Sequence, residues 1–219
     1  MSSSSPSARA RFLDLDPQER ALWLDPAEGE FTTHGFEGAS LNRIIAAAGE
    51  SKGRTYHYFS NKGALFRATL ERRLAPLADL MPTVDDLTTS DARAFWQTLA
   101  GLCLRLTECF QQDTRLAALI RTLHREIAAQ EAVAAPLNAF RAQIGAALQA
   151  GQTIGAVRDD LPLSMLSDVA LDLLISIDRW FAHHAAALSE GEEAALSRRA
   201  FSLLMTPLLP PSQTQGPLS

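Results

Sequence analysis

The alternation of apolar and polar residues between positions 38 and 74 predicts short helices separated by tight turns. The first helix has one apolar face, whose members recur at helical spacing: Leu41, Ile44, Ile45 and Ala48. Ser40 is its expected N-cap, because a serine hydroxyl accepts a hydrogen bond from an amide of the opening turn. Gly49 can adopt the left-handed conformation that ends a helix, and Ser51 is placed to cap the next one. Two capped helices joined by a short turn with glycine predict a helix-turn-helix.

The helix that follows Ser51 is predicted to have an inward and an outward side. At about 100° per residue, Thr55 and Phe59 share one side and are expected to pack inward. The remaining positions point outward or lie on the flanks, and they carry basic, aromatic and small residues: Lys52, Gly53, Arg54, Tyr56, His57 and Tyr58.

Two lysines stand in the first turns of predicted helices, Lys52 after Ser51 and Lys62 after Asn61. The helix macrodipole disfavours a cation there by roughly 0.3–1 kcal/mol. Two interpretations are open. Either both side chains are simply solvated, or they mark a surface to which an anion binds, since helix N-termini are themselves anion sites.

The remainder of the chain predicts an all-α protein. Ala and Leu are the two most frequent residues, and no run of β-branched residues alternates at a period of two. The helix predicted at 162–188 is apolar nearly all round, so one side faces its own core and the other needs a partner. Further helices are predicted over residues 91–112, 115–130, 134–150 and 192–205.

The N-terminal region is expected to begin with a disordered, serine-rich tail over residues 1–15. Its Arg9 and Arg11 are either solvated or in contact with the phosphates or the minor groove of DNA. Two helix starts follow, at Asp16 and Asp25, each with an Asp cap, a proline and a Glu in the first turn. Because a proline inside a helix costs about 3 kcal/mol, we expect a kink or break at Asp25–Pro26.

The net charge of −5 is distributed unevenly along the chain. Residues 38–73 contain seven basic and two acidic side chains, a net charge of +5, so the remainder carries −10. The local field decides where a polyanion docks, and this distribution therefore predicts a positive head attached to an acidic body.

Other kinds of chemistry are not supported by the spacing of reactive residues. His183 and His184 are adjacent, and His124 and Glu126 are two apart, so neither pair has the helical spacing of a metal site. Asp159-Asp160 is expected in a loop, as a helix cap rather than an acid/base pair. No glycine-rich phosphate loop or nucleophile elbow occurs. We expect no metal, no cofactor and no enzymatic activity.

The two cysteines and the hydropathy of the chain indicate the cellular compartment in which the protein is expected. Cys103 and Cys109 point about 120° apart on one predicted helix and cannot bridge each other there. Two free thiols are typical of a reducing compartment. No window of about 18 uncharged apolar residues is present, and the opening MSSSSPSARARF lacks the apolar core of a signal peptide. These features predict a cytoplasmic protein without a membrane segment.

The segment SKGRTYHYFSNKGAL resembles the SKGxxYxxFxxKxxL signature of the tetracycline-repressor (TetR) family of bacterial transcription factors. The preceding FTTHGFEGASLNRIIAAAG is similar to the end of that family's first helix, its glycine turn and its second helix. The resemblance covers roughly residues 21–74. The sequence departs from the family at Pro26, where alanine is typical, at Glu50, where an apolar residue is usual, and at Gly63, where glutamate is frequent.

The resemblance implies a division into a tail, a DNA-binding head, a body for effector binding and dimerisation, and a flexible end. On this sequence these are residues 1–15, 16–74, 75–206 and 207–219. Dimerisation would use the helices at 162–188 and 192–205, which would form a four-helix bundle with the second subunit.

The resemblance also assigns DNA contacts. Arg54 would read base edges, Gly53 would let the backbone approach, and Tyr56 and His57 would touch bases or phosphates. Phosphate would be held by four further residues: Ser40, Lys52, Tyr58 and Lys62.

An unknown small-molecule effector would bind in the body and change the spacing of the two heads. Aromatic residues at helical spacing form plain core as readily as pocket walls. The candidates for such a pocket are Trp96, Cys103, Phe110, Phe140 and Trp180. The hypothesis is a ligand-responsive homodimeric repressor of a palindromic operator. The alternatives are an activator or ligand-independent regulator of the same fold, and an all-α enzyme or interaction module.

Overall fold

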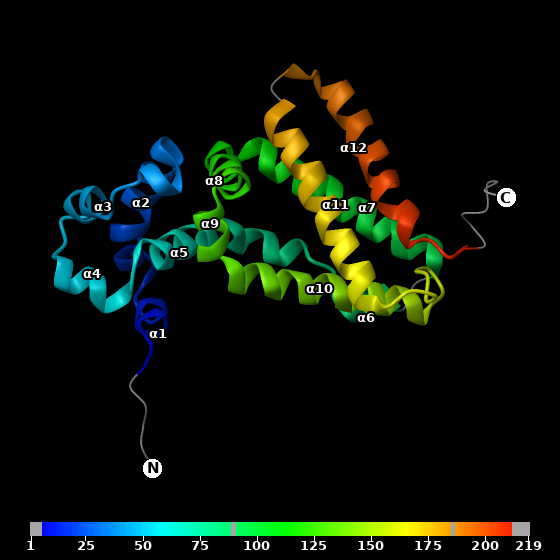
Figure 1. Cartoon of the computed structure of the whole chain (residues 1–219), viewed down its shortest axis with the longest axis horizontal. Helices are drawn as coiled ribbons and strands as arrows, with labels where there is room; N and C mark the ends of the chain where they lie inside the picture. Colours follow the sequence, from blue (N-terminus) through cyan, green and yellow to red (C-terminus); the bar gives the residue numbers. More distant parts are fainter. Residues whose placement is uncertain (1–5, 89–90, 185–186, 212–219) are drawn as a thin grey trace, which may run out of the picture. The chain divides into compact units, whose positions relative to one another are not determined.

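The computed structural model describes residues 6–88, 91–184 and 187–211, and these residues form helices without any strand (Figure 1). The all-α prediction is confirmed. The chain divides into two compact units. Unit 1 comprises Met1–Pro76 and Asp113–Ala134, and unit 2 comprises Leu77–Gln112 and Ala135–Ser219. Residues 113–134, which the sequence assigned to the body, therefore pack with the N-terminal helices.

The helix-turn-helix lies in unit 1 and is built from the predicted local signals. The side chains of Ser40 and Ser51 accept hydrogen bonds from amides in the first turns of α3 and α4. Gly49, between the two helices, has a φ of +67°, which glycine adopts without strain. The helices of unit 1 are α1 (Ala8–Leu13), α2 (Pro17–Gly38), α3 (Leu41–Ala47), α4 (Lys52–Tyr58), α5 (Lys62–Leu74), α8 (Thr114–Arg125) and α9 (Ile127–Ala132).

The long helix α2 continues through Pro26. Of the kink or break predicted at Asp25–Pro26, the break is therefore wrong. Gly35 is the residue inside α2 whose backbone is not helical, with φ 70° and ψ −173°. Tertiary packing holds a helix more strongly than local propensity does. Here it acts on both sides of the proline, where buried residues pack into the unit: Trp23, Leu24, Ala27 and Glu28.

Helix α1 corrects the prediction that residues 1–15 form a disordered tail. Residues 1–5 lie outside the described ranges, but Ala8–Leu13 is helical. Phe12 is 3% exposed, and its ring packs on those of Trp23 and Phe59, with centroids 6.4 and 4.6 Å away. A helix of six residues is not stable alone, and this buried ring is one of the contacts that hold it against the unit.

The helix predicted over residues 115–130 is divided into α8 and α9 at Glu126. The Glu126 carboxylate accepts a hydrogen bond from the amide of Glu37 at 2.6 Å, in the last turn of α2. Gly35 lies against the same carboxylate, and a Cβ added there would collide with Glu126 Oε1. The interruption of α2 at Gly35 and the division between α8 and α9 at Glu126 therefore lie at the same contact between these two segments.

The contact between α9 and α5 explains the glycine at position 63. A Cβ added to Gly63 would lie 3.1 Å from the Cβ of Ala132 and 3.2 Å from Oδ1 of Asn61. The Asn61 side chain caps α5 by accepting a hydrogen bond from the amide of Ala64. A larger side chain at this position would have to displace α9 or the cap.

Unit 2 is a helical bundle around one apolar cluster. Gly151 packs directly against this cluster, and a Cβ there would collide with side-chain atoms of Phe95 and Val157. Leu208 is 3% exposed and belongs to this cluster, so the prediction of a flexible tail that begins at residue 207 is wrong. Residues 212–219 lie outside the described ranges. The helices of unit 2 are α6 (Val84–Thr88), α7 (Ala92–Gln112), α10 (Ala134–Thr153), α11 (Leu163–His184), α12 (Glu190–Met205) and the 3-10 helix Thr206–Leu208, while a 3-10 helix over Ala75–Leu80 follows α5.

Candidate nucleic-acid interface

Helix α4 has the inward and outward sides that the sequence predicts. Thr55 and Phe59 are 0% and 2% exposed. The Thr55 hydroxyl donates to the carbonyl of Ser51 at 3.0 Å and accepts from the indole N–H of Trp23 at 3.2 Å. These contacts fix α4 to α2. The exposed residues of α4 are Lys52, Gly53, Arg54, Tyr56 and His57, while Tyr58 is partly buried.

The C-terminal end of α4 is held by α1 and α2. The ring of Tyr58 packs on Phe12 and Trp23, with centroids 6.2 and 5.2 Å away. Arg11, expected to be solvated or to touch DNA, instead donates from Nη2 to the carbonyl of His57 at 2.7 Å. A cation at this end also complements the helix dipole. The exposed side of α4 thus stands on a rigid support.

Arg54, the predicted base reader, does not extend freely into solvent. Its Nη1 donates to Oε1 of Glu50 at 2.5 Å, and its Nη2 lies 3.7 Å from Oε1 of Glu19. Its Cζ lies 5.1 Å from the ring centroid of Trp23. The side chain nevertheless remains 42% exposed, so DNA can reach it.

The two lysines have different surroundings. The ammonium of Lys62 donates to the carbonyls of Glu37 and Ala39 at 3.1 and 3.0 Å, and lies 4.8 Å from the ring centroid of Phe36. Its place in the first turn of α5 is thus explained by the carbonyls at the end of α2. Lys52 is exposed and makes no hydrogen bond or ion pair within the described part of the chain.

Ser40 is fixed at the junction of α2 and α3. Its amide donates to Oε1 of Glu30 at 2.8 Å, while its hydroxyl accepts from the amide of Arg43 at 3.4 Å. Arg43 Nε donates to the same Glu30 carboxylate at 2.8 Å, and this guanidinium lowers the pKa of Glu30. The Ser40 hydroxyl is therefore engaged as a helix cap.

The positive charge predicted for residues 38–73 is largely balanced within the fold. Arginines of this segment pair with acids outside it, such as Arg43 with Glu30 and Arg72 with Asp25. Over all of unit 1 there are thirteen basic and twelve acidic residues, a net charge of +1, against −6 for unit 2. The contrast between head and body persists, but the head is much less positive than the segment alone indicates.

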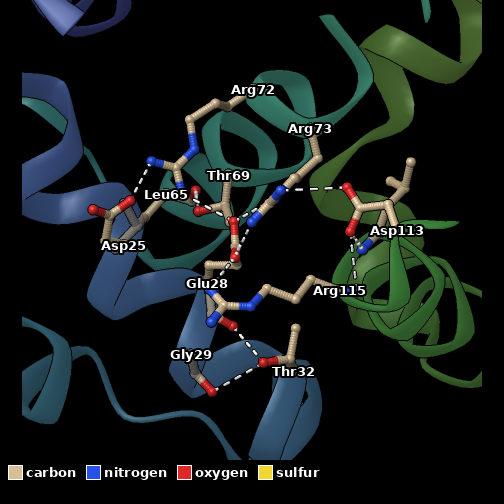
Figure 2. A network of polar contacts seen from close by, with 11 residues as sticks. Asp25, Glu28, Gly29, Thr32, Leu65, Thr69, Arg72, Arg73, Asp113 and Arg115 are labelled. Atoms are coloured by element: carbon tan, nitrogen blue, oxygen red, sulfur yellow. Dashed lines mark hydrogen bonds and ion pairs between the residues drawn. The ribbon is translucent and has the colours of Figure 1, made fainter. Parts of the chain in front are cut away.

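Glu28 is the centre of the largest ion-pair network of the described residues (Figure 2). It is 0% exposed, and its carboxylate accepts hydrogen bonds from Arg73 Nε at 2.6 Å, Arg115 Nη1 at 2.8 Å and Arg72 Nη2 at 3.0 Å. Burial alone would raise the pKa of Glu28, but the hydrogen bonds from the three arginines outweigh it and lower the pKa to about 2. The network joins α2, α5 and α8.

The candidate effector residues of unit 2 lie in different environments. Trp96 packs at the edge of the apolar cluster and donates from its indole N–H to the carbonyl of Ala156 at 3.2 Å. Burial raises the pKa of the Cys103 thiol to about 11. Phe110 and Phe140 are partly buried. Trp180 is 42% exposed and stacks on His184, so it lies on the surface of unit 2.

Predictions from the sequence also concern the two cysteines, metal-binding clusters and membrane-spanning helices. Cys103 and Cys109 are both free. Within residues 6–88, 91–184 and 187–211, no three His, Cys, Asp or Glu side chains gather as metal ligands would. No helix in those ranges combines the length and apolarity that crossing a bilayer requires.

In this helix-turn-helix the second helix is anchored on one side and exposed on the other. This arrangement is that of the helix-turn-helix class of DNA-binding transcriptional regulators. Residues 24–69 match the family described as bacterial regulatory proteins, tetR family. The chain is 30% identical over 170 residues to the HTH-type transcriptional repressor SCO4008 of Streptomyces coelicolor, covering 75% of this chain and 79% of that protein. The protein belongs to the TetR family and is a transcriptional regulator rather than an enzyme.

Solved structures share this fold. NalD, the secondary repressor of the MexAB-OprM multidrug efflux pump in Pseudomonas aeruginosa, aligns with a TM-score of 0.67 and 19% identity over 88% of this chain and 96% of its own. FadR from Bacillus subtilis, solved in complex with stearoyl-CoA, aligns with a TM-score of 0.66 and 16% identity over 84% of this chain and 97% of its own. At these identities the likeness shows the fold alone.

Proposed function

We propose that the protein is a homodimeric, ligand-responsive repressor that reads a near-palindromic operator through α4. The observation that carries the DNA-reading part is the exposed side of α4, on which Lys52, Arg54 and His57 are accessible. Thr55 and Phe59 anchor the opposite side. The relative named a transcriptional repressor supports repression as the outcome of binding.

Each exposed residue of α4 has a role in this proposal. Arg54 donates to a base edge, where a bidentate contact discriminates by about 1–3 kcal/mol. Gly53 admits the sugar-phosphate backbone, and Tyr56 and His57 contact bases or phosphates. Lys52 is the principal phosphate contact, supported by Tyr58 and Ser40.

Lys62 is expected to add less phosphate affinity than Lys52. Its ammonium already donates to the carbonyls of Glu37 and Ala39. A phosphate oxygen would therefore compete with these two acceptors or share the remaining N–H.

Dimerisation through α11 and α12 is supported by exposed apolar side chains. Met165, Val169 and Trp180 fall within about 60° of one another around α11 and are 51%, 38% and 42% exposed. Leu203 of α12 is 59% exposed. A two-fold dimer places its recognition helices about 34–36 Å apart, in successive major grooves.

The effector is proposed to bind within unit 2, near the partly buried residues Trp96, Cys103, Phe110 and Phe140. The complex of the similarly folded FadR with stearoyl-CoA supports a small molecule as its ligand. Binding would favour a conformation whose two recognition helices no longer fit the grooves.

The test begins with selection of duplexes from a random-sequence library by the full-length protein. The selected duplex and a scrambled duplex are then titrated by fluorescence anisotropy at several salt concentrations. The variants are Lys52→Ala, Lys62→Ala and Arg54→Ala, and Arg141→Ala, in α10 of unit 2, is the control.

Lys52→Ala should weaken binding to both duplexes equally and reduce the salt slope by about one. Arg54→Ala should reduce the preference for the selected duplex by roughly 5- to 150-fold, the equivalent of about 1–3 kcal/mol. Wild-type behaviour of both variants would contradict DNA reading by α4.

A further inference from the structure

Glu50 is placed where it controls the side chain of Arg54. Its amide donates to the carbonyl of Ile45 at 3.2 Å, so the turn at Gly49 fixes its backbone. Its side chain is 11% exposed, and its carboxylate accepts from Arg54 Nη1 at 2.5 Å. Glu50 therefore holds the guanidinium from a fixed point immediately before the Ser51 cap of α4.

The guanidinium of Arg54 has two further contacts, both from α2. Glu19 Oε1 lies 3.7 Å from Nη2, and the Trp23 ring lies under Cζ at 5.1 Å. Trp23 cannot shift easily, because it is 0% exposed and hydrogen-bonded to Thr55. The free protein thus keeps Arg54 folded against its own surface between two carboxylates and an aromatic ring.

A carboxylate, a phosphate and a guanine edge each offer acceptors that suit the fork of N–H donors of a guanidinium. Phosphates occur in every sequence, whereas a correctly placed guanine occurs in few. If Arg54 were free, it would bind phosphate on any duplex and strengthen binding without discrimination. The Glu50 carboxylate removes that option and also repels phosphate oxygens near the start of α4.

We propose that Glu50 is a specificity-determining residue, which lowers affinity for non-cognate DNA by holding Nη1 of Arg54 away from phosphate, while the other N–H donors of the guanidinium reach the base edge without breaking this contact. The inference rests on the proposed reading of base edges by α4. Glu50 does not itself contact the bases; it acts through Arg54. It is therefore a positioning residue, and its effect must vanish when Arg54 is absent.

The experiment is a double-mutant cycle of Glu50→Gln and Arg54→Met, measured by anisotropy on the selected and scrambled duplexes. Glutamine keeps the shape of Glu50, and circular dichroism with thermal melting verifies that each variant is folded. Glu37→Gln is the matched control, because it removes an exposed carboxylate from the same unit without a contact to Arg54. A second variant, Glu50→Ala, provides the same test without the amide.

Glu50→Gln should tighten binding to the scrambled duplex by about 1.5- to 5-fold, the range of one ion pair at a protein surface, and tighten binding to the selected duplex less. The ratio of the two affinities should fall accordingly, and in the Arg54→Met background it should not change. Glu37→Gln should leave the ratio unaltered.

Two results would overturn the inference. One is equal tightening on both duplexes, which indicates general repulsion by the carboxylate. The other is an unchanged effect of Glu50→Gln in the Arg54→Met background. If Arg54→Met alone leaves the ratio intact, base reading by Arg54 fails instead, so the two failures are distinguishable.

Discussion

Replacing Glu28 by glutamine is predicted to destabilise unit 1, because it removes the anion that three arginines share. The carboxylate is fully buried and accepts hydrogen bonds from Arg72, Arg73 and Arg115 (Figure 2). A glutamine offers one acceptor oxygen, and its amide N–H groups would face guanidinium donors. Removing one partner of a buried ion pair typically costs about 3–5 kcal/mol.

The lowered pKa of Glu28 gives a second magnitude for its contribution to the stability of unit 1, and it also gives the pH range over which that contribution is lost. A pKa of about 2 instead of 4.5 corresponds to about 3 kcal/mol of stability linked to ionisation of Glu28. Because the folded-state pKa is depressed, this contribution is fully present above pH 4.5 and is lost as the pH falls toward 2. Between pH 7 and pH 3 the loss amounts to about 2 kcal/mol.

The assay is urea denaturation of wild type and Glu28→Gln at a series of pH values, with hydrogen exchange of α2, α5 and α8 as the local readout. At pH 7 the variant should be less stable by about 3 kcal/mol or more, and the gap should narrow by about 2 kcal/mol at pH 3. Glu71→Gln is the control, since Glu71 pairs with Arg9 and Arg67 but is partly exposed. It should cost less than about 1 kcal/mol. Equal stability of Glu28→Gln and wild type at pH 7, or a gap independent of pH, would refute the reasoning.

Three further substitutions test other contacts. Phe12→Ala should cost about 3–5 kcal/mol if α1 is an integral part of unit 1, whereas a loss below 1 kcal/mol in urea denaturation would indicate a detached tail. Gly35→Ala should destabilise by more than about 1 kcal/mol, because φ is +70° and the methyl group meets Glu126; a thermal melt unchanged from wild type would contradict the contact. Met165→Asp should shift sedimentation velocity from dimer toward monomer, and an unaltered dimer would exclude this side of α11 as the interface.

The helix-turn-helix was predictable because its signals are local. The caps Ser40 and Ser51, the turn glycine Gly49 and the buried pair Thr55 and Phe59 act within a few residues of the chain. The interactions that these residues make do not depend on residues far away in the sequence. The same holds for the long amphipathic helices of unit 2.

The errors arose where distant segments meet. Glu28 and Arg115 are 87 positions apart, and no spacing rule connects them. The positive charge of the folded head was overestimated for this reason, since acids from α2 pair with arginines of residues 38–73. The prediction of a disordered tail over residues 1–15 failed because Phe12 packs into unit 1 and fixes α1 there. The predicted helix break at Pro26 failed because packing on both sides of the proline outweighs the lost hydrogen bond.

Placement of α4 against DNA is tested most directly by photo-cross-linking. A benzophenone amino acid replaces His57, exposed on α4, or Leu104, which is 41% exposed on α7, and each protein is irradiated with the selected duplex. We predict a covalent adduct from position 57 that the unlabelled selected duplex displaces and the scrambled duplex does not, and none from position 104. Equal yields from both positions, or an adduct from position 104 alone, would contradict recognition through α4.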